Sequence, residues 1–287
     1  MLVSFYQFLT GMNESGVHVI SSQLTEHLHY PGCRPDENIF LALANRKIIG
    51  ICELAPEAAI GRVLLNIIVH PEYRRNGVGS ELLTKALLRG REIGLYVTHA
   101  NISESNVAGK SFLEAHGFKR IRQYSELHLN IRDRKIEAPD PHPFRLKSLK
   151  KGQEYLLTMM QNEFFKGSWG FNPNSVEKVR YEILTCGGTH NDILVTFDGN
   201  RPVGYCWTKT DVQRAKKGRI HMIGVNPAYR GGGLGKATLQ AGLCRLKHQG
   251  VHAVELTTDS SNTPAVRLYR SMGFKVRDTL PWYERKR

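Results

Sequence analysis

One glycine-rich pattern occurs twice in this chain, and it constrains the fold more than any other feature. Arg-x-x-Gly-x-Gly spans Arg74–Gly79 and returns 156 residues later at Arg230–Gly235. The same offset carries Asn106 onto Asn262. Further pairs at this offset are Val69 and Val225, Pro71 and Pro227, Tyr73 and Tyr229, Gly94 and Gly250, and Gly117-Phe118 and Gly273-Phe274. An ungapped repeat of this length indicates two copies of one folding unit.

Each glycine-rich loop lies between an apolar run and an amphipathic stretch. The apolar runs are 64–69 and 220–225, so each loop is predicted at a strand-to-helix junction. Backbone N–H groups converge at such a junction, and they favour binding of a phosphate. The alternative interpretation is a tight turn whose glycines serve packing alone.

Length and composition agree with two globular domains. The chain has 287 residues, of which 41% are hydrophobic and 23% charged, and a domain typically takes roughly 100–200 residues. A polar stretch at 132–143, with prolines at 139, 141 and 143, is typical of an extended linker. We therefore expect an N-terminal domain at 1–138 and a C-terminal domain at 139–287.

Hydrophobic periodicity predicts an α/β fold with a mixed sheet in each half. In the first half we expect a strand at 2–8 and a helix at 16–29. In the second half the expected strands are 144–149, 192–197, 202–209, 219–225, 253–258 and one from 275, and the expected helices are 153–165, 175–185, 236–248 and 262–272.

The sequence predicts a cytoplasmic protein without a bound metal. The first residues lack a basic segment followed by an apolar core, and no apolar run approaches the roughly 20 residues of a membrane span. The five cysteines are scattered without a Cys-x-x-Cys pair, which favours neither a disulfide framework nor a zinc site.

Positive charge is concentrated in the second half. The formal net charge is +14, and residues 139–287 carry 24 Lys and Arg against 12 Asp and Glu. A basic face of this kind suits a polyphosphate ligand, a nucleic acid or a membrane surface, or it is only a solvated surface. No nucleic-acid-binding motif is visible.

Two linked motifs carry a family resemblance. Val-x-Pro-x-Tyr-Arg-x-x-Gly-x-Gly, followed by Asn-x-x-Ala-x-x-x-Tyr-x-x-x-Gly-Phe, resembles the GNAT acetyltransferase superfamily, and parts of both motifs occur in each half. The tandem arrangement is most similar to the mycothiol synthase-like branch, which has a glutamate where this chain has Arg219. The resemblance implies two tandem acyl-CoA N-acyltransferase domains.

The resemblance also implies acetyl-CoA as the acyl donor. Small loop residues let backbone N–H groups turn toward the pyrophosphate, and Arg230 or Lys236 would oppose its charge. Backbone groups of 223–225 would pair with the pantetheine arm, and one N–H would polarise the thioester carbonyl. The implied donor-binding residues are Ile223, Gly224, Val225, Arg230, Gly231, Gly232, Gly233, Leu234, Gly235, Lys236, Asn262 and Arg267, with Ile67, Val69, Arg74, Arg75, Asn76, Gly77, Val78, Gly79, Ser80 and Asn106 in the first half.

Two side chains are the candidates for proton transfer. By the resemblance Tyr269 is the acid that protonates the departing thiolate, although outside the motif it would read as a core aromatic residue. Its first-half counterpart is Leu113. His221 lies two residues beyond Arg219 and thus on the same strand face, which makes it the candidate base for the amine, or else a structural strand histidine. Glu255 and Asp259 are the other candidate bases.

The expected activity is acetyl transfer to a primary amine of a small molecule by direct attack, performed by the second half. The first half is then a degenerate copy that retains its glycine loop. An aromatic cluster at 164–171 is either a wall of the acceptor site or part of the core. The alternative function is a non-catalytic acetyl-CoA sensor whose basic half contacts nucleic acid or another polyanion. A monomer and a homodimer both remain open.

Overall fold

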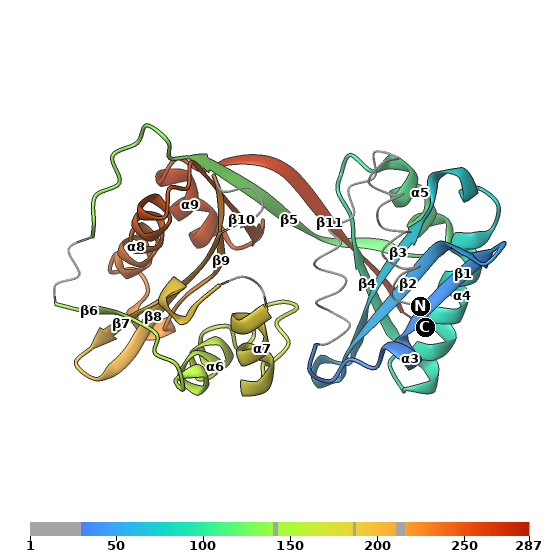
Figure 1. The fold of residues 1–287 in the computed structure, drawn as a ribbon, viewed down its shortest axis with the longest axis horizontal. Helices are drawn as coiled ribbons and strands as arrows, with labels where there is room; N and C mark the ends of the chain where they lie inside the picture. The colour runs from blue at the N-terminus through green and yellow to red at the C-terminus, as the bar shows by residue number, and fades with distance from the viewer. Residues whose placement is uncertain (1–29, 140–142, 186–187, 211–215, 287) are drawn as a thin grey trace. The chain divides into compact units, whose positions relative to one another are not determined.

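The chain forms two compact units that do not coincide with the two sequence repeats. The structure is a computed structural model that describes residues 30–139, 143–185, 188–210 and 216–286. Within this part, the first unit takes 30–102, 106–121 and 282–286, and the second takes 103–105 and the residues from 122 to 281 (Figure 1). The boundary expected after residue 138 separates the two sequence repeats, whereas the two compact units are the groups of residues that contact one another in space.

The first unit is a mixed sheet with helices against one face. Its described elements are α3 (Pro35–Asn38), β1 (Ile39–Ala44), β2 (Lys47–Glu57), η1 (Ala58–Ile60), β3 (Arg62–Val69), η2 (Pro71–Tyr73), α4 (Val78–Glu92), β4 (Val97–Asn101), α5 (Val107–Ala115), the start of β5 (Lys119–Asn130) and the end of β11 (Lys275–Lys286). β1, β2 and β3 form an antiparallel meander, β4 runs parallel to β3, and the end of β11 pairs antiparallel with β4.

The second unit repeats this strand plan. Its elements are most of β5, β6 (Arg145–Ser148), α6 (Glu154–Phe164), α7 (Val176–Thr185), η3 (His190–Asp192), β7 (Ile193–Asp198), β8 (Arg201–Thr210), β9 (Lys217–Val225), η4 (Pro227–Tyr229), α8 (Leu234–His248), β10 (Ala253–Asp259), α9 (Thr263–Ser271) and most of β11. Two of these helices, α6 and α7, lie between β6 and β7 in the chain. β6 to β9 pair antiparallel in sequence order, β10 runs parallel to β9, and β5 pairs antiparallel with β10.

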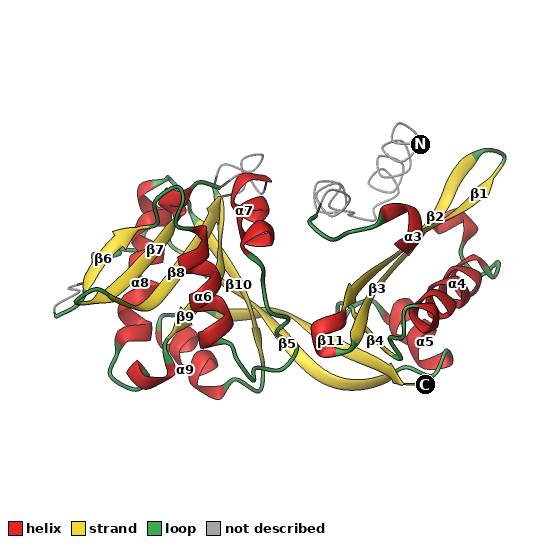
Figure 2. Cartoon of the chain, turned by 90° about the horizontal axis from the view of Figure 1, so that it is seen from below, coloured by secondary structure: helices red, strands yellow, loops and turns green. Residues whose placement is uncertain are grey.

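Helices cover both faces of the second unit's sheet. α8 and α9 pack on one face, where Leu239, Leu243 and Tyr269 join a core that includes Cys206. α6 and α7 pack on the other face, where the core includes Trp207 (Figure 2). Successive residues of β8 therefore face different cores, as strand geometry requires.

The two repeats exchange their last strands. β5 belongs to the first repeat but pairs with β10 of the second unit, and its Leu127 is completely buried in the core under α8. β11 belongs to the second repeat, but its end pairs with β4, and Tyr283 is 1% exposed in the first unit's core. Leu127 and Tyr283 are counterparts at the 156-residue offset. Each unit is thus completed by a strand of the other repeat.

The elements expected in the second half agree with the observed ones to within two residues at nearly every end. The described part of the stretch at 132–143 contains no helix or strand. The strand expected at 2–8 and the helix expected at 16–29 lie outside the described residues. Among the described helices, none combines the length and the apolar character that a bilayer span requires.

Candidate functional site

The second glycine-rich loop has the backbone geometry of an anion-binding turn. Gly231 and Gly233 have φ of 87° and 85°, in the left-handed region that favours glycine. Gly233 is the N-cap of α8, and within the described chain no backbone carbonyl accepts from the N–H groups of Gly232, Gly233, Leu234 and Gly235. A Cβ built on Gly232 meets no atom within 4 Å. These unbonded N–H groups at a helix N-terminus fit a diphosphate.

The arginine that opens each loop ties the loop to the preceding strand. Arg230 Nε donates to the Val225 carbonyl at 3.2 Å, and its Nη2 donates to the Phe164 carbonyl at 2.9 Å. Arg74 Nε donates to the Val69 carbonyl at 3.0 Å in the first unit. Two of the five guanidinium N–H donors of Arg230 and one of those of Arg74 are thus used within the protein.

Strands β9 and β10 separate along their length. Their parallel pairing covers only 217–219 and 253–255, while β10 stays paired with β5 as far as Asp259. Beyond Arg219 the edge of β9 therefore faces an opening in the sheet. Ile223, Gly224 and Val225 lie along that edge, and a Cβ on Gly224 would come within 2.8 Å of the Tyr205 ring. Only glycine fits there.

A bulge interrupts β9 at His221. Met222 pairs with Trp207 and Ile220 pairs with Thr208, which leaves His221 as the extra residue. β3 of the first unit pairs with β2 without any such shift from Arg62 to Val69. A bulge redirects side chains and local backbone groups, so the two units differ at the point where the strands separate.

His221 lies on the α7 side of β9, next to a carboxylate. Its Nε2 is 3.4 Å from Glu182 Oε2, its ring meets the Trp207 ring edge-on at 4.6 Å, and its side chain is 30% exposed. Burial lowers the pKa of His221, Glu182 raises it, and the cations Lys209 and Arg219 lower it, with a net shift downward. The imidazole is therefore kept neutral near pH 7 and able to accept a proton.

Arg219 and His221 share the α7 side of β9, as regular alternation predicts, because Ile220 between them faces the core under α8. The bulge breaks the alternation only beyond His221, where Met222 lies on the α7 side as well. Among the described residues Nδ1 of His221 has no hydrogen-bond partner, and a proton on Nε2 facing Glu182 leaves Nδ1 as the acceptor.

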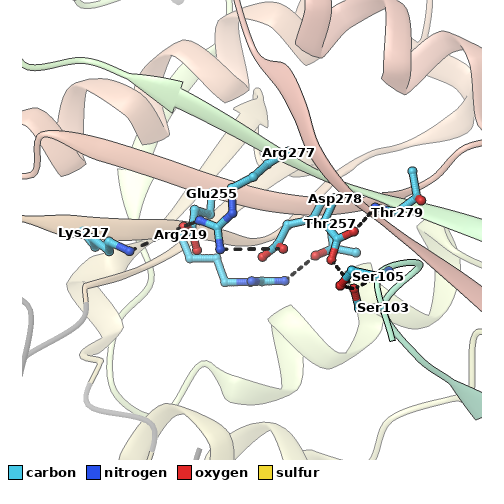
Figure 3. A network of polar contacts seen from close by, with 10 residues as sticks. Ser103, Ser105, Lys217, Arg219, Glu255, Thr257, Arg277, Asp278 and Thr279 are labelled. Atoms are coloured by element: carbon cyan, nitrogen blue, oxygen red, sulfur yellow. Dashed lines mark hydrogen bonds and ion pairs between the residues drawn. The ribbon is translucent and has the colours of Figure 1, made fainter. Parts of the chain in front are cut away.

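The other candidate bases are held in ion pairs. Glu255 pairs with Arg277, and Lys217 lies 4.0 Å from the same carboxylate. Asp259 accepts from Arg122 at 2.7 Å. Figure 3 shows the network around Glu255 and the neighbouring contact of Arg219 with Thr257. Because the Glu255 and Asp259 carboxylates already contact cations, His221 is the better placed candidate to meet an amine.

Tyr269 is buried on the opposite side of β9 from His221. It is 7% exposed, it meets the Phe274 ring edge-on at 6.0 Å, and it shares a core with Ile223. Burial raises the pKa of Tyr269, so the hydroxyl stays protonated at neutral pH. Among the described residues its hydroxyl has no hydrogen-bond partner. Its counterpart Leu113 lies in the first unit's core.

The two asparagines related by the 156-residue offset, Asn106 and Asn262, act as helix N-caps. The Asn262 side chain accepts from the N–H of Ala265 at 3.3 Å at the start of α9, and Asn106 accepts from Gly109 at 2.9 Å at the start of α5. A cap of this type satisfies an otherwise unbonded helix N–H. Their amide nitrogens have no partner in the described chain.

The remaining donor-binding candidates are placed as follows. Lys236 lies in the first turn of α8 and Arg267 is exposed on α9. In the first unit Gly77 has φ of 83° and is the N-cap of α4, Arg75 has φ of 65°, and the Ser80 hydroxyl lies 3.0 Å from His116 Nε2. The others lie on β3, in the loop or at the start of α4: Ile67, Val69, Asn76, Val78 and Gly79.

The aromatic cluster at 164–171 divides between core and surface. Phe164 is buried in the core under α6, and Phe165 stacks on Phe171 with ring centroids 5.5 Å apart. Trp169 is half-buried against Tyr124 and lies under the Arg122 guanidinium, 5.3 Å from its ring centroid. Phe164 thus belongs to the core, whereas Trp169 lies against Arg122, which also contacts Asp259.

Sequence reasoning missed three residues of this site. Glu182 lies on α7, in the segment where the two repeats diverge, so no repeat match marks it. Thr257 and Lys209 lie on strands with ordinary alternation, and only the strand pairing brings them beside Arg219.

Comparison with known proteins covers both repeats. The acetyltransferase (GNAT) family model matches residues 156–274, and the acetyltransferase (GNAT) domain model matches residues 35–120. The mycothiol acetyltransferase of Arthrobacter sp. (strain FB24) is 30% identical, over 91% of this chain and 79% of the relative. That of Corynebacterium glutamicum (strain R) is 27% identical, over 94% of this chain and 89% of the relative.

Solved structures share the fold over nearly the whole chain. A GCN5-related N-acetyltransferase from Sphaerobacter thermophilus has a TM-score of 0.75 at 19% identity, covering 99% of this chain and 91% of that one. A tandem GNAT protein from the clavulanic acid biosynthesis pathway has a TM-score of 0.73 at 16% identity, covering 99% and 94%.

Proposed function

Because this chain belongs to the GNAT acetyltransferase family, we propose that its second unit transfers an acetyl group from acetyl-CoA to a primary amine of a small molecule by direct attack. The chain is an N-acetyltransferase, and GNAT acetyltransferases in general use acetyl-CoA. That family membership sets aside the non-catalytic sensor. The first unit is proposed to be a degenerate copy without turnover.

One observation carries the assignment to the second unit. Within the described chain, that unit combines the glycine loop, the bulge at His221 and the buried Tyr269, whereas the first unit has a glycine loop with an unbulged β3 and Leu113. The loop supplies unbonded N–H groups for the diphosphate of acetyl-CoA, and the exposed edge of β9 supplies N–H groups for its amide arm and thioester carbonyl.

The proton of the attacking ammonium requires a base on the acceptor side. An alkylammonium titrates near about 10, so most of the acceptor is protonated at neutral pH. His221 Nδ1 takes this proton, directly or through a water, while Glu182 holds the ring in the tautomer with Nε2–H. Glu182 is a positioning residue because it acts through His221.

The departing thiolate requires an acid on the other side of β9. Tyr269 donates its hydroxyl proton there, and its raised pKa keeps that proton in place until the thiolate forms. The amine adds to the thioester carbonyl and loses a proton to the base, and the C–S bond of the tetrahedral intermediate then breaks as the thiolate takes a proton from the acid. A base and an acid on opposite sides of one strand can serve these two steps separately.

The identity of the amine is open within this proposal. The relatives named above are mycothiol acetyltransferases, so the amine precursor of mycothiol is one candidate acceptor for this chain. Arg219 occupies the position at which that branch has a glutamate, so this position of the acceptor side carries a positive charge in place of a negative one.

The experiment measures thiol release and acetylated product from acetyl-CoA and a panel of amines, with Gly232→Asp as the test variant. Gly232 has ordinary φ and open space around it, so the change introduces a negative charge at the diphosphate site without backbone strain. We expect the acetyl-CoA Kd to rise and turnover to fall to background.

Asn76→Asp is the matched control, because Asn76 is the first-unit counterpart of Gly232. It should leave turnover unchanged. If Gly232→Asp keeps wild-type affinity and rate while Asn76→Asp loses them, the catalytic unit is the first one and the proposal is wrong.

A further inference from the structure

Two cations lie side by side near the opening of the second unit's sheet without a carboxylate partner. Lys209 and Arg219 are direct cross-strand neighbours on β8 and β9, and both are partly buried. Arg219 Nη2 donates to Thr257 Oγ1 at 2.7 Å, and the Lys209 ammonium lies 4.9 Å from the Trp207 ring centroid. Glu255 is the register partner of Arg219 on β10, but its carboxylate contacts Arg277 and Lys217 instead. Within the described chain neither Lys209 nor Arg219 lies within 4.0 Å of an acidic oxygen.

Lys209 and Arg219 differ from the neighbouring cations, which contact carboxylates. Among the nearby cations, Arg277 and Lys217 contact Glu255 (Figure 3), and Arg122 contacts Asp259. Like charges directly opposite each other across a strand pair are destabilising, and partial burial strengthens their repulsion. An anion placed between Lys209 and Arg219 would relieve it.

The position of the pair excludes the phosphates of acetyl-CoA as that anion. Arg219 is the last β9 residue paired with β10, and the glycine loop begins beyond Val225, six residues further along the strand. At about 3.3 Å per residue the separation is roughly 20 Å. His221 lies between the two, next to the Trp207 ring. The pair therefore lies on the acceptor side of the candidate base.

We propose that Arg219 and Lys209 bind an anionic group of the acceptor, a carboxylate or a phosphate, so that the substrates are amines that also carry negative charge. The planar guanidinium offers two parallel donors to such a group, and the ammonium adds a point charge. An acceptor held by its anion on this side has its amine directed toward His221. This inference rests on the proposed function and names the substrate class of the same site.

The test compares matched acceptors that differ in one charge. β-Alanine is paired with β-alaninamide, and glucosamine 6-phosphate with glucosamine, so that the two arms separate carboxylate from phosphate recognition. We expect a lower KM for the charged member of at least one pair. Arg219→Gln and Lys209→Gln should each raise that KM by about 10- to 100-fold, the usual effect of removing a charge-assisted hydrogen bond, with little change for the neutral member.

Two further variants serve as controls. Arg219→Lys should recover part of the preference, because it restores the charge without the planar fork. Lys217→Gln removes a cation from the same strand that already faces Glu255, and it should leave the preference intact.

The outcomes that overturn this inference differ from those that overturn the proposed function. Equal KM values within both pairs, or an equal loss on both members in Arg219→Gln, would overturn the anion site while acetyl transfer stands. If no amine is acetylated, the proposed function fails, and calorimetric titration of the charged acceptors into the CoA-bound protein still decides the site. Binding lost in Arg219→Gln supports it, and absence of binding to the wild type refutes it.

Discussion

At the scale of single residues, the two repeats differ most clearly at one pair of equivalent positions. Tyr269 and Leu113 are both buried in the core beside the glycine-loop helix of their unit. Only the tyrosine has a proton to give, and burial holds it on the oxygen. The sequence predicts that Tyr269 and Leu113 are equivalent, because each follows the N-cap asparagine of its helix by the same number of positions.

Replacing Tyr269 with Phe should lower kcat by about 10²- to 10⁴-fold, because the thiolate then leaves without a proton donor. The acetyl-CoA Kd should change little, since the ring still fills its core position. Steady-state thiol release and equilibrium titration measure the two quantities. Leu113→Ala is the control, because it removes core volume from the first unit and should affect stability while the second unit's kcat is kept. Full turnover in Tyr269→Phe would place the acid elsewhere.

We expect the pH dependence of kcat/KM to arise from the titration of His221. Its pKa is lowered by burial and by two nearby cations, so kcat/KM should rise with pH through a limb below the usual histidine range and then level off. Glu182→Gln removes the carboxylate that raises this pKa, and the limb should move to still lower pH while the plateau falls. The profile is measured with an amine of known pKa, so that substrate ionisation can be factored out.

His221→Ala should abolish that limb, and His221→Gln tests whether the hydrogen bond alone suffices. A limb that keeps its position in Glu182→Gln would show that the carboxylate does not act through the ring. Neither Glu182 nor the bulge is predictable from the sequence, because α7 lies where the repeats diverge and because a bulge at His221 leaves the expected face unchanged.

At the scale of secondary-structure elements, the sequence predicts far more. Strand and helix periods, turn glycines and the repeat offset locate the second half's elements closely, since these signals are local and occur in both copies. The glycine loops are equally predictable, because glycine, which lacks a Cβ, readily adopts the φ near 85° found at Gly233 beside a helix start. Periodicity does not predict which strands pair or for how long, so it does not show that β9 and β10 pair over only three residues.

The cap residues allow an element-scale test that separates structure from binding. Asn262→Ala should lower the free energy of unfolding by about 1 kcal/mol, because α9 loses its N-cap acceptor. Asn262→Asp keeps the acceptor oxygen but replaces the amide donor with a negative charge. If the Asn262 amide nitrogen donates to acetyl-CoA, Asn262→Asp raises the acetyl-CoA KM without loss of stability. Chemical denaturation and donor titrations measure the two effects, and an unchanged KM would confine Asn262 to its role as a cap.

At the scale of the whole molecule, the strand exchange decides which residues stabilise which unit. The sequence cannot reveal it, because β5 and β11 are equivalent strands of the two repeats, and either strand could complete either unit. Leu127 and Tyr283 occupy equivalent positions and are equally buried, each in the unit that the other repeat mainly builds. Only the observed pairing shows that the compact units differ from the repeats.

Leu127→Ala, a change in the first repeat, should therefore destabilise the second unit by about 2–5 kcal/mol through a cavity beneath α8. Hydrogen exchange resolved along the chain should speed up in α8 and β10 and stay unchanged in α4. Tyr283→Ala should give the reverse pattern, with faster exchange in α4. Exchange that rises in the repeat carrying the mutation would contradict the strand assignment.

The exchanged strands also bear on how such a chain can evolve. If the first repeat performs no chemistry, as we propose, it would ordinarily be free to shrink or disappear, but it supplies β5, without which β10 of the second unit would have an open edge. Its deletion would remove activity together with the fold. Selection on the enzyme would therefore preserve the first repeat as a scaffold even without turnover there, and substitutions in either half are constrained by the side chains of the other.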